Sequence, residues 1–121
     1  MLNHLPRILK AHRFRLSHEF VLQNGIAGVL LEAGIPFERE HCLRNGRDRV
    51  DFFVDMQREG GIALEVKVDG SLSEVTRQLH RYAQHPDVRA IVLVTTRAMH
   101  DRMPAEMCGK PVRVIHLEGA F

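Results

Sequence analysis

The sequence contains no apolar run that approaches the ~20 residues of a membrane-spanning helix. Its first ten residues lack the long apolar core and small-residue cleavage site of a signal peptide, so we expect a cytoplasmic protein that does not bind a membrane. Cys42 and Cys108 are the only cysteines, and nothing secretory surrounds them. We therefore expect buried or idle thiols instead of a disulfide, and two cysteines are too few for a zinc site of their own.

Several catalytic signatures are also missing. The sequence has no Gly-rich phosphate loop, no nucleotide-binding fingerprint and no Ser/His/Asp pattern, so kinase, dehydrogenase and esterase functions have no support. Eight histidines are present, but none has the paired helical spacing of a zinc enzyme; His80 and His85, for example, are five positions apart. We interpret the histidines as surface residues or phosphate contacts.

The composition that remains is that of one compact domain. The 121 residues are 45% hydrophobic and 26% charged, which is ordinary for a globular chain and argues against disorder, so residues 1–121 should form a single domain. The net charge of +2 is unevenly spread, because Arg7, Lys10, Arg13 and Arg15 lie close together near the N-terminus. Residues 1–16 are therefore predicted to be a basic arm, either solvated or in contact with phosphates through Arg13 and Arg15.

The first half of the chain predicts a helix and a hairpin. Apolar residues recur at helical spacing over residues 17–33, with Ser17 as the expected N-cap and Gly34 and Pro36 ending the helix. Two extended runs follow at residues 37–43 and 49–55, separated by the turn signal Asn45-Gly46.

The second half predicts alternating strands and helices. Residues 62–68 alternate strictly, and a helix over residues 72–84 follows the capping box of Ser71 and Glu74. Residues 90–95 are typical of a strand buried on both faces, and a further strand is expected at residues 112–117 after a short helical or irregular piece. The expected fold class is α/β, with a mixed central sheet of four to five strands flanked by helices.

Pairing the runs at 50–55 and 61–67 as antiparallel strands brings three charged residues together. With the loop Met56 to Gly60 centred on Arg58, positions whose numbers add to 116 face each other. Asp55 then meets Gly61, and Asp51 meets Glu65 on one face of the sheet, with β-carbons roughly 5 Å apart. Lys67 points to the same face, about 7 Å further along its strand.

Two carboxylates placed opposite each other repel and raise each other's pKa, so they need a cation, a proton or water between them. Mg²⁺ or Mn²⁺ answers that need, because hard divalent cations prefer oxygen ligands. Such a metal can polarise a phosphoryl oxygen, and the Lys67 ammonium can position the attacking water and offset developing charge. This is the chemistry of phosphodiester hydrolysis. The alternative is that Asp51, Glu65 and Lys67 form a hydrated strand face in which Lys67 neutralises the acids.

Residues 49–54 (RVDFFV) and 62–68 (IALEVKV) resemble the core motif of the PD-(D/E)XK nuclease superfamily, which includes restriction endonucleases and Holliday-junction resolvases. The resemblance covers about two thirds of the chain, from the first helix to the strand at residue 90, although Val50 replaces the motif's proline. It implies a restriction-endonuclease-like core in the order helix, three strands, helix, strand (αβββαβ). It also implies that Asp51 and Glu65 are metal ligands, with the Val66 carbonyl as a possible third, and that Lys67 is the catalytic lysine.

The same resemblance implies further site residues. Members often carry a Glu on the first helix, and Glu19 fits that position better than Glu32, although an acid in a first turn is also stabilised by the helix dipole alone. Gln78 and Tyr82 are similar to the Gln-x-x-x-Tyr motif of a subset of the superfamily, which places Gln78 near the metal and the helix near the nucleic acid. On composition alone Tyr82 could instead fill the core and Gln78 lie at the surface.

These observations predict a nuclease that hydrolyses DNA with Mg²⁺ or Mn²⁺; RNA is not excluded as a substrate. Arg77 and Arg81 share a face of the second long helix and are expected either to hold backbone phosphates or to be solvated. Because 121 residues leave little surface beyond the core, gripping a duplex or branched DNA should require a homodimer or a larger assembly. The alternative function is a non-catalytic nucleic-acid-binding or assembly module with the same fold.

Overall fold

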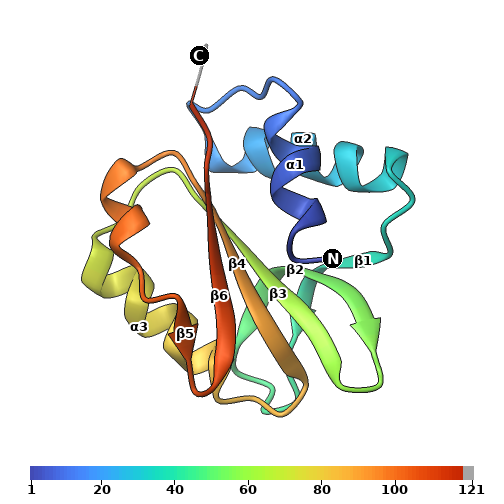
Figure 1. Ribbon diagram of the computed structural model, residues 1–121, viewed down its shortest axis with the longest axis vertical. Helices are drawn as coiled ribbons and strands as arrows, with labels where there is room; N and C mark the ends of the chain where they lie inside the picture. The colour runs from blue at the N-terminus through green and yellow to red at the C-terminus, as the bar shows by residue number, and fades with distance from the viewer. Residues whose placement is uncertain (119–121) are drawn as a thin grey trace.

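The structure is a computed structural model that describes residues 1–118, and these residues form a mixed sheet between layers of helices (Figure 1). The elements, in chain order, are α1 (His4–Lys10), α2 (Glu19–Glu32), β1 (Phe37–Cys42), β2 (Arg49–Gln57), β3 (Gly60–Lys67), α3 (Leu72–Ala83), β4 (Val88–Thr95), the 3-10 helix η1 (Ala98–Arg102), β5 (Glu106–Met107) and β6 (Lys110–His116). Helices α1 and α2 cover one face of the sheet, and α3 covers the other.

Within residues 1–118 the sheet has six strands in the order β1-β2-β3-β4-β6-β5. β1, β2 and β3 are antiparallel neighbours, whereas β3, β4 and β6 run parallel. The α/β class is therefore as predicted, but the prediction of four to five strands was wrong. The extra strand, β5, has only two residues, Glu106 and Met107, and pairs with the start of β6, so it is too short to show any periodicity in the sequence.

The predicted pairing of β2 with β3 is confirmed where both strands are regular, because Phe52 faces Leu64 and Phe53 faces Ala63. The hairpin turn is shorter than predicted and consists of residues 58 and 59 alone. A bulge lies between Val54 and Gln57, so the predicted one-to-one pairing of Asp55 with Gly61 is replaced by a shift in register. Asp55 has a φ of 52° at the bulge.

Arg89 of β4 holds this bulge in place. Its Nη2 donates to Oδ2 of Asp55 at 2.7 Å, and its Nη1 donates to the Asp55 carbonyl at 2.6 Å and also to the Gly60 carbonyl. The guanidinium thus binds the backbone on both sides of the hairpin turn as well as the Asp55 carboxylate.

Of the two N-caps predicted for the long helices, one is confirmed and the other was wrong. The N–H of Glu74 donates to Oγ of Ser71 at 3.2 Å, so Ser71 caps α3 as predicted. Helix α2 instead begins at Glu19 with His18 as its N-cap residue, and no side chain caps it. The predicted cap at Ser17 was therefore wrong.

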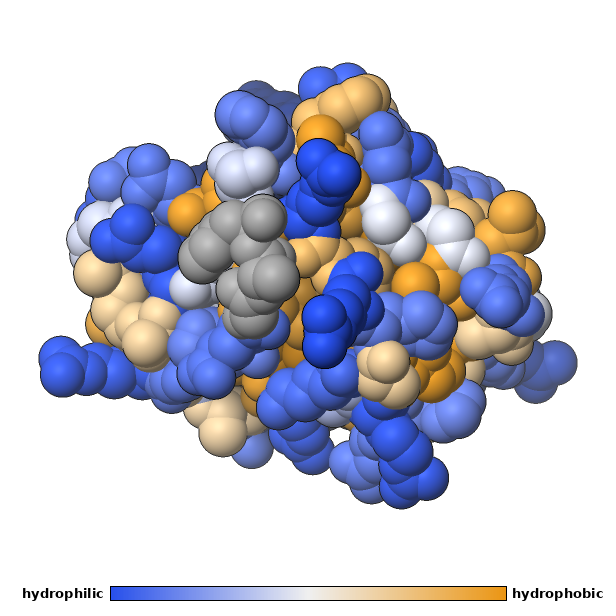
Figure 2. Space-filling model, turned by 90° about the horizontal axis from the view of Figure 1, so that it is seen from above, coloured by the Kyte–Doolittle hydropathy of each residue, from blue (hydrophilic) through white to orange (hydrophobic). Residues whose placement is uncertain are grey.

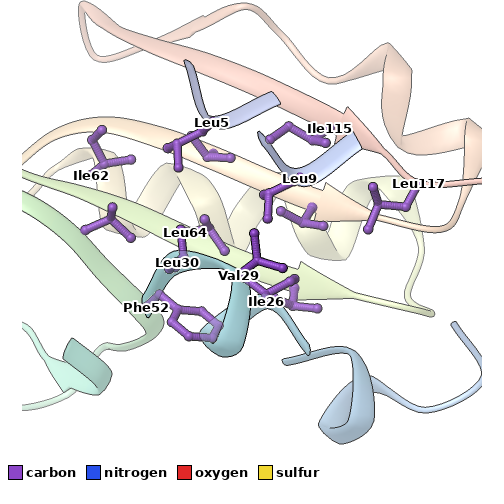
Figure 3. Close-up of a cluster of buried hydrophobic side chains, with 14 of the residues drawn as sticks. Leu5, Leu9, Ile26, Val29, Leu30, Phe52, Ile62, Leu64, Ile115 and Leu117 are labelled. Carbon is purple, nitrogen blue, oxygen red and sulfur yellow. The ribbon is translucent and has the colours of Figure 1, made fainter. Parts of the chain in front are cut away.

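The N-terminal residues belong to the core. Leu5 and Leu9 of α1 are fully buried, and Leu16 is also buried, next to residues of α2 and the sheet (Figure 3). Residues 1–16 are thus a packed part of the domain instead of the predicted arm, because Leu5 and Leu9 are four positions apart and share one face of a helix. No helix within residues 1–118 has the length and apolar character needed to cross a membrane.

Candidate active site

The structure brings Asp51, Glu65 and Lys67 together at the junction of β2 and β3. The N–H of Asp51 donates to Oε1 of Glu65 at 3.1 Å, and the N–H of Val66 donates to Oδ2 of Asp51 at 2.8 Å. Lys67 extends from the same strand as Glu65, and its Nζ lies 3.3 Å from Oε2 of Glu65. The predicted proximity of the two acids and the lysine is therefore confirmed.

Burial makes this acid pair electrostatically unusual. Glu65 is 2% exposed, and burial followed by repulsion from Asp51 raises its pKa to about 7, although Lys67 acts in the opposite direction. Burial also raises the pKa of Asp51, against the lowering effects of the Val66 N–H and Lys67. Two acids whose charges are poorly solvated favour a proton or a cation between them.

Tyr82 and Gln78 of α3 support Glu65 from the side of the helix. The Tyr82 hydroxyl lies 3.1 Å from the Arg49 carbonyl and 3.4 Å from Oε1 of Glu65, and it accepts a hydrogen bond from Nε2 of Gln78 at 2.9 Å. A phenol has one proton, so Tyr82 donates to one of its two acceptors at a time. Burial, followed by the charge on Glu65, raises the Tyr82 pKa.

Tyr82 is only 2% exposed, so in this structure it packs in the core instead of facing a nucleic acid. The sequence had left core filling open as the alternative for this residue. Its hydroxyl nevertheless reaches the acid pair, which connects the helix with the site.

A cleft of about 420 Å³ opens beside Lys67. Its lining residues come from α2, the end of β3, the β3–α3 loop and α3, and include Glu19, Lys67, Asp69, Gly70, Arg77, Gln78 and Arg81. The cleft thus collects the predicted acid of α2, the lysine and both predicted arginines. Asp51 and Glu65 are not among its lining residues, and Lys67 connects them with it by contacting Glu65.

No family model matches this chain, and no curated protein or solved structure matches it.

The donor atoms present fit a hard divalent cation. Among residues 1–118, no three acidic, histidine or cysteine side chains converge closely enough to hold a metal ion by themselves. Asp51 and Glu65 offer two carboxylates, and Mg²⁺ commonly uses one or two together with water and substrate phosphates. Glu19 lines the cleft, and its charge contributes to the raised pKa of Asp51. The Val66 carbonyl stays a predicted ligand, because the contact seen at the pair comes from the Val66 N–H.

The remaining predicted nucleic-acid contacts differ in position. Arg77 is exposed at the cleft, whereas Arg81 is exposed and makes an ion pair with Asp48, Nε to Oδ1, at 3.3 Å. Arg13 and Arg15 are exposed in the segment that precedes α2 and do not line the cleft.

Sequence reasoning missed Glu40. The pairs of Arg39 with Phe52 and of His41 with Val50 place Glu40 beside Asp51 in the sheet, and Glu40 contributes to the raised pKa of Asp51. Its φ is 52°, and its carboxylate lies 3.2 Å from Nε of Arg49. The only sequence signal for Glu40 was an acidic residue in an extended run whose polar and apolar residues alternate imperfectly.

Proposed function

We propose that this protein is a divalent-metal-dependent nuclease that hydrolyses phosphodiester bonds of DNA, on a restriction-endonuclease-like core. One observation carries the proposal: the half-buried Asp51 and the buried Glu65 each accept a hydrogen bond from the backbone of the neighbouring strand, and Glu65 is contacted by Lys67, which lines an open cleft. A lysine beside two acids with raised pKa values is the arrangement expected at a functional centre.

The order of elements supports the same proposal. From α2 to β4 the chain runs through one helix, three antiparallel strands, a helix and a parallel strand. This is the αβββαβ order implied by the resemblance to PD-(D/E)XK nucleases. Asp51 lies on the second strand of this order, β2, and Glu65 lies on the third, β3.

Each group then has a distinct task in the proposed reaction. Asp51 and Glu65 would hold Mg²⁺ or Mn²⁺, which when bound supplies Lewis acidity toward a phosphoryl oxygen and acidifies water. The ammonium of Lys67 orients the attacking water from the cleft side and offsets the negative charge that develops on the phosphorus oxygens. Arg77 and Arg81, which both line the cleft, hold the flanking phosphates.

Tyr82 and Gln78 act by positioning Glu65. The Tyr82 hydroxyl donates either to Oε1 of Glu65 or to the carbonyl of Arg49, and Gln78 restrains the hydroxyl in turn. The position of the acids is thereby linked to the helix that carries the arginines.

The deciding experiment is cleavage of linear, circular, single-stranded and branched DNA, and of RNA, with Mn²⁺, Mg²⁺ or chelator. We expect metal-dependent cleavage by wild type that is lost in Lys67→Ala. Lys10→Ala is the matched control, because Lys10 is exposed and lies outside the cleft lining. Absence of cleavage under every condition, with nucleic-acid binding unaffected by chelator, would favour the non-catalytic binding module instead.

The small surface beyond the core leads us to propose a homodimer or a larger assembly when the substrate is a duplex or a junction. Light scattering with and without duplex DNA tests this separately, and a monomer in both conditions would refute it.

A further inference from the structure

Phe20 is a large apolar side chain exposed to solvent in the first turn of α2. It is 70% exposed and, among residues 1–118, is the one exposed Phe or Tyr. It directly follows Glu19, which lines the cleft, so its Cα lies about 3.8 Å from that of Glu19. Most of the surface seen from above is hydrophilic, with apolar side chains exposed only in small patches (Figure 2). An exposed aromatic ring next in sequence to a residue of the cleft can bind a ligand with an apolar face.

Three basic residues precede Phe20 in the chain, and the acidic Glu19 lies next to it. Arg13, Arg15 and His18 are exposed in the segment that leads into α2. This segment is held against the helix, because the Phe14 ring packs on Gly25, with Cδ1 only 2.8 Å from where a Cβ would stand. The basic segment is therefore held against α2, the helix that carries Phe20.

We propose that Phe20, Arg13, Arg15 and His18 form a docking surface for single-stranded nucleic acid that leads into the cleft. This proposal rests on the proposed function, since it names the form of substrate that the same site receives. An aromatic ring can stack only on a base that is not already enclosed in a duplex, and arginines bind the backbone of any sequence. The combination of an exposed ring and basic groups is therefore complementary to an unpaired strand.

The chain offers a direct spectroscopic test, because it contains no tryptophan. Phe20→Trp places a single indole at the proposed surface. Leu31→Trp is the matched control, since Leu31 is 74% exposed and lies near the other end of the same helix. Both variants should unfold at the wild-type temperature, because both positions are exposed.

The titration is done with oligothymidine and with a duplex of equal length, in chelator so that nothing is cleaved. We expect the single strand to quench the emission of Phe20→Trp and to leave Leu31→Trp unchanged, and the duplex to quench neither. Phe20→Ala should raise the Kd for the single strand about tenfold, whereas Leu31→Ala should not. Removing Arg13 and Arg15 should reduce the salt dependence by about 0.7 in slope per lost phosphate contact.

In the titrations, three results would overturn the proposal: unchanged single-strand affinity in Phe20→Ala, an equal loss of affinity in Leu31→Ala, or equal quenching of Phe20→Trp by duplex. Dissociation of an oligomer by Phe20→Ala in light scattering would also overturn it, because the ring would then belong to a protein interface. Failure of the nuclease proposal is distinguishable, since it would abolish cleavage with every metal while the quenching in chelator persists.

Discussion

The main-chain N–H of Asp51 donates a hydrogen bond to Oε1 of Glu65 across 3.1 Å, so that one acid of the site holds the other. The carboxylate of Asp51 accepts a hydrogen bond from the N–H of Val66 at 2.8 Å in return. Each carboxylate is thus attached to the backbone of the neighbouring strand. The pairing of β2 with β3, instead of side-chain flexibility, therefore sets the distance between the two acids, which is the kind of rigid support that a precise site requires.

Glu65 should make the metal-free protein less stable as the pH rises. Its pKa is about 7 in the folded protein against an ordinary value of 4.5, so the folded state binds a proton that the unfolded state has already lost. The resulting stabilisation is complete below about pH 4.5 and is lost as the pH rises through about 7. A shift of this size corresponds to about 3 kcal/mol in the free energy of unfolding.

Urea denaturation in chelator at several pH values measures this dependence. Glu65→Gln cannot titrate but keeps an acceptor for the Asp51 N–H, so its free energy of unfolding should fall less than that of wild type over the same interval. A variant that follows the wild-type curve would show that another group titrates.

Mn²⁺ should raise the unfolding temperature of wild type, and by more at about pH 8 than at about pH 6. A ligand that binds only the folded state stabilises it by about 2.7 kcal/mol at one hundred times its Kd. A proton on Glu65 competes with the cation, so binding weakens below the raised pKa. Differential scanning fluorimetry of wild type, Asp51→Asn and Glu32→Gln tests the effect. The increase should disappear in Asp51→Asn and remain in Glu32→Gln, because Glu32 is exposed at the far end of α2.

Tyr82→Phe should reduce both stability and cleavage. The change keeps the buried ring but removes the donor to the Arg49 carbonyl and the acceptor of the Gln78 amide. We expect a loss of about 1–2 kcal/mol in the free energy of unfolding. Because Glu65 also loses a restraint, kcat should fall more than KM rises. His80→Ala, at an exposed position of the same helix, should change neither quantity. A stability loss with kcat intact would limit Tyr82 to a role in folding.

The proximity of Asp51, Glu65 and Lys67 could be predicted from the sequence for a physical reason. Two strands joined by a short turn have few possible registers, and strict alternation in β3 decides which side chains share a face. Asp51, Glu65 and Lys67 could therefore be placed together from the sequence alone. The bulge at Asp55 did not disturb this prediction, because it lies between Val54 and the turn, beyond the acids.

Other features depend on contacts that are distant in sequence. Tyr82 becomes buried only when α3 packs on the sheet. Its hydroxyl then donates to the carbonyl of Arg49, which is 33 positions away in the sequence. Helix α1 has only seven residues, which is too short for a convincing period, so its basic side chains dominated the interpretation. The conformation of Glu40, with a φ of 52°, has no local signal, because glutamate seldom adopts it.

Leu9→Ala should show that the N-terminal segment contributes to the stability of the whole domain. Leu9 is fully buried against α2 and the sheet, and truncating such a side chain costs about 2–5 kcal/mol. Arg7→Ala on the exposed side of α1 should change the free energy of unfolding by less than about 0.5 kcal/mol. Urea denaturation of the two variants separates the possibilities, and equal effects would mean that α1 is not docked.

Two glycines of α2 should respond in opposite directions to substitution by alanine. A Cβ at Gly28 would meet no atom within 4 Å, so Gly28→Ala should stabilise the protein by about 0.5–1 kcal/mol through the higher helix propensity of alanine. A Cβ at Gly25 would stand 2.8 Å from Cδ1 of Phe14, so the ring must move and the gain is offset or reversed. Chemical denaturation of both variants measures the difference. If Gly25→Ala stabilised as much as Gly28→Ala, Phe14 would not hold the basic segment against α2, and the proposed route of a single strand past Phe20 would lose its anchor.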